Sequence, residues 1–322
     1  MLIKNWAGWE LPDAAATPEA VFLDRRRFLG ASGLALGALA VPGAAGVARA
    51  AAGDPTANLY PAMRNLRYRV SRELTKESVS STYNNFYEFG SHKRIADAAQ
   101  ALPIRPWTVR IDGLVEKEQT IDFDRLIRMM PLEERLYRHR CVEAWSMTVP
   151  WTGFPLRALL DLARPLGSAK YVEMQTFLNP EVAPGQKQFW YPWPYVEGLT
   201  IAEAANELAF LVTGVYGKPM AKQFGAPLRL AVPWKYGFKS VKSIVLFRFT
   251  EKRPKTFWEE VQPKEYGFWA NVNPDVAHPR WSQATEKLIG TSDRTRTHIY
   301  NGYGEFVAQL YAGMKLGDRL FR

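Results

Sequence analysis

The chain of 322 residues contains one cysteine, Cys141, and this limits how the chain can be held together. A single cysteine forms no internal disulfide, so the fold depends on a hydrophobic core. Hydrophobic residues make up 47% of the sequence, which excludes a disordered chain. Burial in the core is the simplest explanation of Cys141, and a reactive thiol or a metal ligand is the alternative.

The first fifty residues have the layout of an export signal. Arg25, Arg26 and Arg27 precede an uncharged apolar run over residues 28–40, and Ala48-Arg49-Ala50 resembles a cleavage site between small residues. The run is too short to span a bilayer. Adjacent arginines before Phe-Leu are typical of the twin-arginine route, which exports folded proteins. We therefore predict a twin-arginine signal peptide over residues 1–50 and a periplasmic mature protein; the alternative is an interfacial N-terminal helix.

The remaining chain is basic. Of the 42 Lys and Arg and the 32 Asp and Glu, residues 1–50 contain five and four, which leaves a net charge of +9. Such a charge fits nucleic acid, an anionic membrane face or an anionic cofactor. Because no segment resembles a nucleic-acid-binding module, we expect no nucleic-acid partner, and we favour an anionic cofactor together with a membrane partner.

Hydrophobic periodicity predicts one α+β core with mixed strands. Residues 51–80 are polar and are expected to cross the surface, and residues 81–322 form the domain. On the strand around Cys141, Tyr137 and His139 share its face, since side chains alternate along a strand. The expected strands cover residues 107–113, 133–142, 170–177, 228–232 and 243–249. The expected helices cover residues 121–130, 155–162 and 201–208.

The residues that could carry chemistry exclude several classes of enzyme. One Cys and four scattered His do not form a zinc site, a haem attachment motif or an iron–sulfur site. No G-x-S-x-G or glycine-rich nucleotide motif is present. If a metal binds, the protein therefore supplies about one thiolate and the cofactor supplies the other ligands. Alternatively, Arg138, His139 or Arg140 activates Cys141 as a metal-free nucleophile.

A basic and aromatic loop covers residues 233–242. Together with Arg229, its Lys235, Lys239 and Lys242 could hold a phosphate through side chains and backbone N–H groups. The alternative is a solvated basic face, which charge runs usually form.

Several long motifs resemble one enzyme family. Arg140-Cys141-Val142-Glu143-Ala144-Trp145-Ser146 and the segment 149–156 resemble the cysteine loop of the sulfite oxidase superfamily of molybdenum enzymes. Further matches at 83–89, 225–239, 271–274 and 301–303 are similar to the branch of periplasmic protein-methionine-sulfoxide reductase catalytic subunits. The match extends from the signal peptide to Tyr303, and motifs of this length in this order are specific.

The resemblance implies a sulfite oxidase-like molybdopterin-binding fold and one molybdenum held by a single molybdopterin dithiolene and by Cys141. It also implies transfer of the sulfoxide oxygen to reduced molybdenum, a membrane haem-binding electron donor, and oxidised periplasmic proteins as substrates. We select Glu143 and Asn85 as further catalytic candidates that orient the site or supply protons; the alternatives are an exposed carboxylate and a turn residue. The cofactor contacts that the resemblance implies are Asn84, Tyr87, Glu88, Thr176, Arg229, Ser240, Val241 and Lys242.

Three features of the chain bear on this resemblance. Phe224 stands where the family typically has Asn, so a side-chain contact is lost there or is made by the backbone. His139 is interpreted as local variation rather than as a catalytic residue. Only 78 residues follow Ile244, too few for the end of the core and an Ig-like dimerisation domain of about 100 residues. This favours the reductase branch and a monomeric catalytic subunit.

Three other functions stay open at this point. The first is a sulfite-oxidising molybdenum dehydrogenase on the same scaffold, which needs an arginine-lined anion pocket. The second is a metal-free thiol hydrolase that uses Cys141. The third is a periplasmic binding protein in which Cys141 is merely buried.

Overall fold

A computed structural model describes residues 54–322 of the chain. The predicted signal peptide, residues 1–50, lies outside the described residues and stays a prediction. Within residues 54–322, no helix is long and apolar enough to cross a membrane.

The first sheet has five strands in the order β2-β1-β10-β5-β6. β1 pairs parallel with β10, and the other neighbours are antiparallel, so the sheet is mixed. Three of these strands were expected from the sequence, at residues 107–113, 170–177 and 243–249. Their bounds are β1 Thr108–Gly113, β2 Gln119–Asp122, β5 Tyr171–Thr176, β6 Val196–Thr200 and β10 Ile244–Thr250.

The second sheet is built around β4, an eleven-residue strand. β3 pairs antiparallel with β4 over nine residues, from Glu133 opposite Gly153 to Cys141 opposite Trp145. On its other side β4 pairs with β11 near its start and with β7 near its end, and β7 also pairs with β8 and β9. The bounds are β3 Glu133–Cys141, β4 Trp145–Pro155, β7 Phe210–Val215, β8 Lys218–Pro219, β9 Arg229–Ala231, β11 Thr285–Leu288 and β12 Arg294–Arg296.

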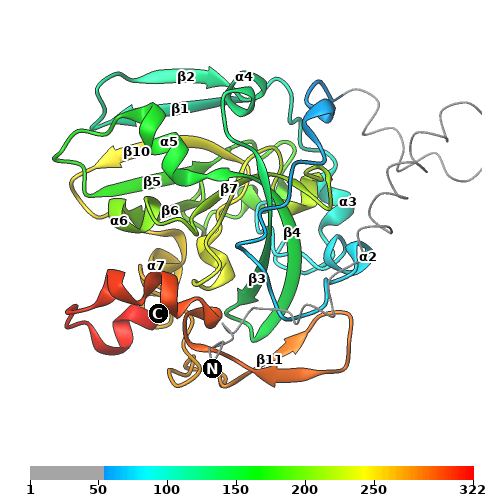
Figure 1. Cartoon of the computed structure of the whole chain (residues 1–322), viewed down its shortest axis with the longest axis vertical. Coiled ribbons are helices and arrows are strands. Elements are labelled where there is room, and N and C mark those ends of the chain that lie inside the picture. Colours follow the sequence, from blue (N-terminus) through cyan, green and yellow to red (C-terminus); the bar gives the residue numbers. More distant parts are fainter. Residues whose placement is uncertain (1–53) are drawn as a thin grey trace, which may run out of the picture.

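Both sheets contribute to one hydrophobic core, as the single α+β core predicted from the sequence requires. Val109 and Phe247 of the first sheet and Trp151 and Phe210 of the second belong to the same buried cluster. Figure 1 shows the long β3–β4 pair running across the strands of the first sheet. This arrangement carries the end of β3, and with it Cys141, away from the first sheet.

The helices are short. The predicted helix at 121–130 is confirmed as α4, and Asp122 caps it by accepting a hydrogen bond from Arg125 N at 3.0 Å. The helix predicted at 201–208 ends at Ala204, because Asn206 turns the chain into β7 by accepting a hydrogen bond from Leu208 N. The α-helices are α2 Glu77–Ser80, α3 Ala96–Ala99, α4 Phe123–Arg128, α5 Leu156–Ala163, α6 Ile201–Ala204, α7 Phe257–Val261 and α8 Gly304–Val307. The 3-10 turns are η2 Ala57–Leu59, η3 Pro184–Lys187, η4 Lys222–Phe224, η5 Gly237–Lys239, η6 Ile299–Gly302, η7 Ala308–Tyr311 and η8 Gly317–Phe321.

The N-terminal part of the described chain does more than cross the surface. Its backbone bonds to β3 on both sides of Arg64, through Glu134 N to Met63 O and Asn65 N to Glu134 O, both at 2.8 Å. Tyr68 is buried in the main core. Most of residues 54–80 are exposed or half-buried, so the segment does cross the surface, and backbone pairing with a strand edge fixes it there.

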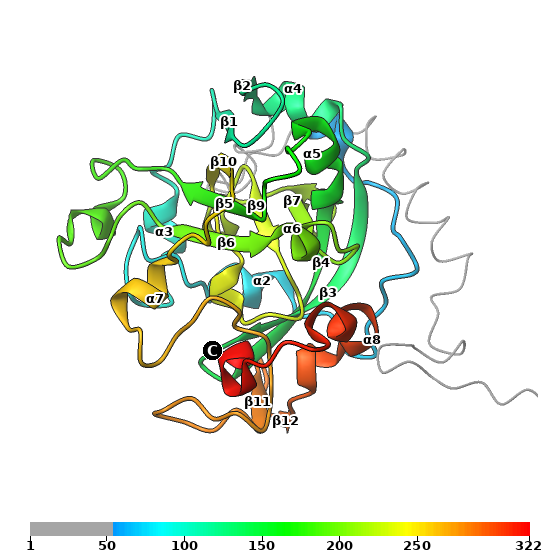
Figure 2. The ribbon, with the colours of Figure 1, turned by 90° about the vertical axis from the view of Figure 1, so that its left-hand side faces the viewer.

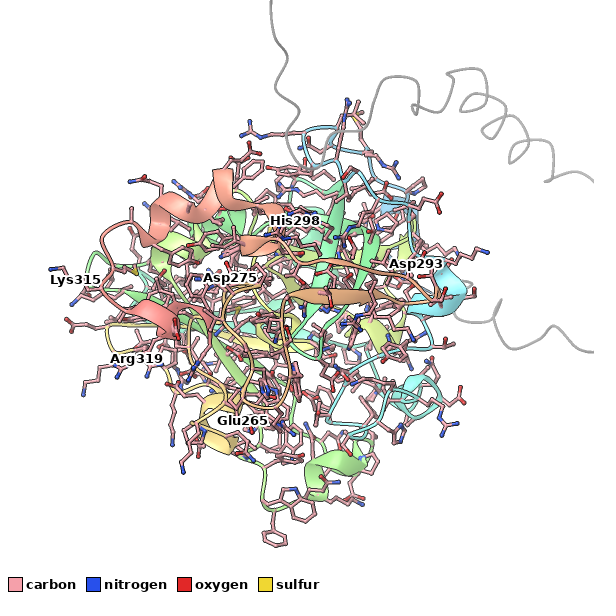
Figure 3. The ribbon with its side chains drawn as sticks, turned by 90° about the horizontal axis from the view of Figure 1, so that it is seen from below. Glu265, Asp275, Asp293, His298, Lys315 and Arg319 are labelled. Carbon is pink, nitrogen blue, oxygen red and sulfur yellow. The ribbon has the colours of Figure 1, made fainter. Side chains whose placement is uncertain are left out.

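The C-terminal segment closes the underside of the molecule. Figure 3 shows this side, where Asp275, Asp293, His298, Lys315 and Arg319 lie on the segment that follows α7. Its β11 carries the fully buried Glu286, which forms an ion pair with Arg140 at 2.8 Å. The segment thereby fixes the strand that ends at Cys141.

Candidate active site

A cavity of about 360 Å³ opens where β3 turns into β4. Its walls come from segments that are far apart in the sequence, and the end of β3 forms part of its lining. The lining side chains come from the segments 83–88, 139–147, 191–195, 223–229, 237–242, 258–266 and 280–281.

A tight turn presents Cys141 to this cavity. Cys141 pairs with Trp145 across the turn, and Ala144 N donates to Cys141 O at 3.1 Å. Ala144 has a φ of 59°, the left-handed region that residues other than glycine rarely adopt. Such strain is concentrated at functional sites. The Cys141 side chain is buried but lines the cavity.

A polar cluster surrounds the thiol. Asn85 Nδ2 and Glu143 Oε2 each lie 3.6 Å from Cys141 Sγ. Glu143 also accepts hydrogen bonds from Asn85 and Trp145 Nε1, each at 3.1 Å, and forms an ion pair with Lys93. Burial opposes ionisation of Glu143, but the hydrogen bond and charge of Lys93 lower its pKa below the usual value. Glu143 is thus a carboxylate held beside the thiol, rather than an isolated exposed side chain.

The thiol itself is not activated by the protein. Burial, together with the Glu143 carboxylate, raises the pKa of Cys141 to about 12. The positive charges of Lys93 and Arg140 oppose this effect but do not offset it, and Arg140 is itself paired with Glu286. A protonated thiol is a poor nucleophile, and thiolate is the form that binds metal. The geometry therefore disfavours a metal-free thiol hydrolase.

Two cations face the cavity without a carboxylate partner among residues 54–322. Arg229 is 3% exposed and donates only to backbone carbonyls, of which Phe224 O at 2.8 Å is the nearest. Burial lowers its pKa to about 9. Lys242 is partly buried, and burial together with the charge of Arg229 lowers its pKa to about 7; the Glu88 carboxylate opposes this shift without forming an ion pair with Lys242. Uncompensated buried charges destabilise a protein unless an anion joins them.

The structure brings ten of the eleven predicted site residues to the wall of this cavity. The eleventh, Thr176, lies behind the wall and donates to Glu88 Oε1 at 3.1 Å, so it supports Glu88. The roles of these residues stay predictions. The ten are Asn84, Asn85, Tyr87, Glu88, Cys141, Glu143, Arg229, Ser240, Val241 and Lys242.

Comparison with known proteins identifies the family. Residues 69–258 match the family described as "Oxidoreductase molybdopterin binding domain". The chain belongs to this family of molybdopterin-binding oxidoreductases. It is 48% identical over 317 residues, 95% of this chain and 96% of the relative, to "Protein-methionine-sulfoxide reductase catalytic subunit MsrP" of Xanthomonas axonopodis pv. citri (strain 306). It is 47% identical over 328 residues, 98% of this chain and 99% of the relative, to the protein of that name from Burkholderia mallei (strain ATCC 23344).

A similar relative and a solved structure complete the comparison. The protein of that name from Xanthomonas campestris pv. campestris (strain ATCC 33913 / DSM 3586 / NCPPB 528 / LMG 568 / P 25) is 49% identical over 313 residues, 95% of this chain and 96% of the relative. The solved structure, the sulfane dehydrogenase SoxCD from Paracoccus pantotrophus, matches at 17% identity with a TM-score of 0.44. This match covers 68% of this chain and 58% of that one and is too weak to support a conclusion.

The cavity of this molybdopterin-binding oxidoreductase fits its cofactor. Within residues 54–322 no group of three or more His, Cys, Asp or Glu side chains could hold a metal, so a cofactor that brings its own chelating sulfurs suits a single thiol. Arg229 and Lys242 await an anion, and Asn84 Oδ1 is a buried acceptor with no partner in the described chain. A pterin with a phosphate group meets these requirements.

The basic loop divides into two parts. Lys235 and Lys239 are fully buried and form ion pairs with Glu203 and Glu197, so they are neither a solvated face nor free to bind a phosphate. Of the four cations predicted as a phosphate clasp, only Arg229 and Lys242 line the cavity.

The structure shows which residues Phe224 and His139 contact in the oxidoreductase. Phe224 packs edge-on against Trp151 at 5.9 Å, and its backbone carbonyl fixes Arg229. The backbone of Phe224 thus makes a polar contact that its apolar side chain cannot make. His139 lines the cavity, and a Cβ on Gly237 would lie 2.5 Å from its Nε2. Burial, with the charges of Arg229 and Lys242, lowers the pKa of His139 well below 6.5, so it is a neutral wall residue.

The sequence did not reveal two further parts of the site. Lys93 is 50 residues from Glu143, and no local sequence pattern links the two. Six aromatic side chains, called the aromatic rim below, also line the cavity, and they were indistinguishable from core aromatics by sequence. They are Tyr191, Tyr195, Phe238, Trp258, Tyr266 and Trp281.

Proposed function

We propose that this chain is the catalytic subunit of a protein-methionine-sulfoxide reductase that acts in the periplasm and receives electrons from a membrane haem-binding partner. The observation that carries the proposal is the cavity: one buried thiol beside two cations that have no carboxylate partner in residues 54–322. Relatives that are 47–49% identical over nearly the whole chain bear the name of this activity.

Cys141 would hold the molybdenum, and Arg229, Lys242 and Asn84 would hold the anionic part of the pterin, with the backbone at Ser240 and Val241. The bound cofactor would supply a two-electron oxygen-atom transfer that converts a sulfoxide to a thioether. The overall reaction would consume two electrons from the partner and two protons and would yield the thioether and water.

The polar cluster has a separate role in this proposal. Glu143 forms an ion pair with Lys93, and the Glu143 carboxylate lies 3.6 Å from the Cys141 thiol. Asn85 links both groups, because it donates to Glu143 and accepts from Lys93 at 2.5 Å. We assign the cluster to proton supply and to orienting the sulfoxide.

The decisive test uses the mature protein purified from a host that makes molybdopterin, beside Cys141→Ser. We expect about one molybdenum per chain and reduction of methionine sulfoxide, both lost in the variant, because a hydroxyl is a poor substitute for a soft thiolate. Circular dichroism checks that the variant is folded. Sulfoxide reduction that persists in folded Cys141→Ser contradicts the assignment.

Sulfite separates this proposal from its nearest rival. A sulfite-oxidising dehydrogenase would turn over sulfite and would leave methionine sulfoxide unreduced. The reductase is expected to do the reverse with the same metal content.

Localisation has its own test. In Arg25→Lys/Arg26→Lys, the positive charge is kept but the twin-arginine signal is lost. We expect the full-length protein to stay in the cytoplasm, while the wild type appears in the periplasmic fraction. Equal export of both proteins contradicts the twin-arginine route.

A further inference from the structure

The loop between β5 and β6 is much longer than its connection requires. These strands are antiparallel neighbours, and a turn of two to five residues commonly joins such strands. Here residues 177–195 join them and include η3. Figure 2 shows this loop extending from the side of the molecule near α7. Loops of this length in a compact domain usually serve a function.

The base of the loop is fixed to the cavity wall. Gly185 N donates to Glu88 O at 2.8 Å, and a Cβ on Gly185 would lie 2.1 Å from Tyr87 O. Buried Gln186 donates to Phe177 O at 2.8 Å and accepts from Asn179 N at 2.7 Å. The loop therefore has a defined position relative to the cavity.

The tip of the loop exposes two large aromatic side chains. Phe189 is 92% exposed and Trp190 is 60% exposed, with their ring centroids 5.2 Å apart. Each side chain forgoes stabilisation that burial would give. Exposed apolar groups that lie together commonly mark an interaction site.

The tip is continuous with the cavity. The Trp190 ring lies 6.1 Å from the Tyr191 ring, and Tyr191 lies 6.1 Å from Tyr87 and 6.4 Å from Trp258. Tyr87, Tyr191 and Trp258 all line the cavity that contains Cys141. One residue of extended polypeptide spans about 3.3 Å, so these two steps correspond to about four residues of a bound chain.

We propose that Phe189 and Trp190 form a docking element for the apolar residues that flank a methionine sulfoxide in a polypeptide substrate. This inference rests on the proposed function and deepens it. A sulfoxide that enters the cavity places the next few residues of its chain over the aromatic rim and the tip. Apolar residues next to the sulfoxide in such a segment would be removed from water against these exposed rings.

The test compares three substrates with the holoenzyme and with Phe189→Ser/Trp190→Ser. The substrates are N-acetylmethionine sulfoxide, a peptide with the sulfoxide between Leu and Phe residues, and the same peptide with Gly and Ser flanks. We expect kcat/KM for the apolar peptide to fall at least tenfold, mainly through KM, because aromatic anchors dominate such contacts. The values for N-acetylmethionine sulfoxide are expected to stay within twofold.

A matched control removes two exposed apolar side chains elsewhere. Met63→Ser/Leu66→Ser changes residues that are 86% and 59% exposed and do not line the cavity. This variant is expected to keep full activity on all three substrates. Equal losses in both double variants, or a loss with N-acetylmethionine sulfoxide in the tip variant, overturn the docking element.

Two other outcomes are also decisive. If the tip variant loses binding to vesicles of anionic phospholipid but keeps its peptide kinetics, the tip is a membrane anchor and the proposal is wrong. If the wild-type holoenzyme reduces both peptides and the variant does so equally well, the docking element alone fails. A wild-type holoenzyme that reduces none of the three substrates overturns the proposed function as well.

Discussion

The segment 229–242 carries buried positive charges on two sides, and these charges are paired with carboxylates on only one of them. On the side away from the cavity, Lys239 pairs with Glu197, and Lys235 lies 2.6 Å from Glu203. On the cavity side, Arg229 and Lys242 have no carboxylate partner in the described chain. All four charges come from one short stretch of sequence, and only the fold separates them.

This difference separates cations that stabilise the fold from cations that are available to bind a ligand. A buried pair is neutral overall, and its loss of hydration is offset by attraction and hydrogen bonds. A buried cation without a partner lacks this offset, so it destabilises the chain until an anion arrives. The paired side is therefore complete without a ligand, and the unpaired side is prepared for an anionic cofactor.

Breaking a pair on the closed side should have the largest effect on stability. Lys239→Met leaves the fully buried Glu197 without its cation, and we expect a loss of about 3–5 kcal/mol in the free energy of unfolding. Urea unfolding of the apoprotein measures it. The double variant Lys239→Met/Glu197→Leu is expected to recover most of this loss, and a single variant as stable as the wild type would refute the distinction.

Removing an unpaired cation should affect the cofactor instead. We expect Arg229→Met to retain cofactor roughly 10–100-fold less well, comparable to the loss of a supporting contact at a metal site. The unfolding free energy of the apoprotein should change by less than about 1 kcal/mol, since a buried charge is lost together with its contacts to carbonyls. Molybdenum content and urea unfolding check both. Full metal content in the variant contradicts an anion-binding role.

The sequence predicted those strands and helices that are determined by the pattern of neighbouring residues. β3 was expected at residues 133–142, and the structure has it at Glu133–Cys141. α5 was expected from leucines at helical spacing and is confirmed at Leu156–Ala163. β4 was missed as a strand although its apolar residues Trp145, Met147, Val149 and Trp151 alternate with Ser146, Thr148 and Thr152, because Pro150 and Gly153 within it argue against a strand.

Site residues could be predicted from the sequence only where they belong to motifs that resemble a known family. The cofactor contacts followed from the resemblance, and ten of the eleven residues meet at one cavity. The pairs that distinguish the cations were beyond the sequence, because Lys239 and Glu197 are 42 residues apart and share no local pattern. Lys93 was missed for the same reason. Long-range pairing depends on the sheet topology, which periodicity does not specify.

The pH dependence of the unfolding free energy should reveal the unpaired cation Lys242. The pKa of Lys242 is about 7 in the folded chain, against 10.5 when unperturbed. Between these values the unfolded chain binds more protons, so the stability of the apoprotein rises with pH. From pH 7 to pH 9 we expect the wild type to gain roughly 1–2 kcal/mol relative to Lys242→Met. Lys235 also titrates in this range, but it does so in both proteins, so its contribution cancels when the two stabilities are subtracted.

Urea midpoints of both apoproteins at the two pH values measure this gain. In the holoenzyme the cofactor's negative charge favours protonated Lys242, so the gain should shrink there. Parallel pH profiles of wild-type and variant apoproteins would show that Lys242 is not a strained cation.

The smallest effect is expected where an ion pair is exposed. Arg157 and Asp161 are one helical turn apart on α5, with Nε and Oδ1 3.0 Å apart and both side chains more than 60% exposed. Arg157→Ala should change the unfolding free energy by less than about 0.5 kcal/mol, because water already solvates both charges. Urea unfolding beside Lys239→Met makes the comparison direct. A loss of similar size in both variants would mean that burial does not decide the strength of these pairs, and the contrast between the two sides of the cavity would lose its physical basis.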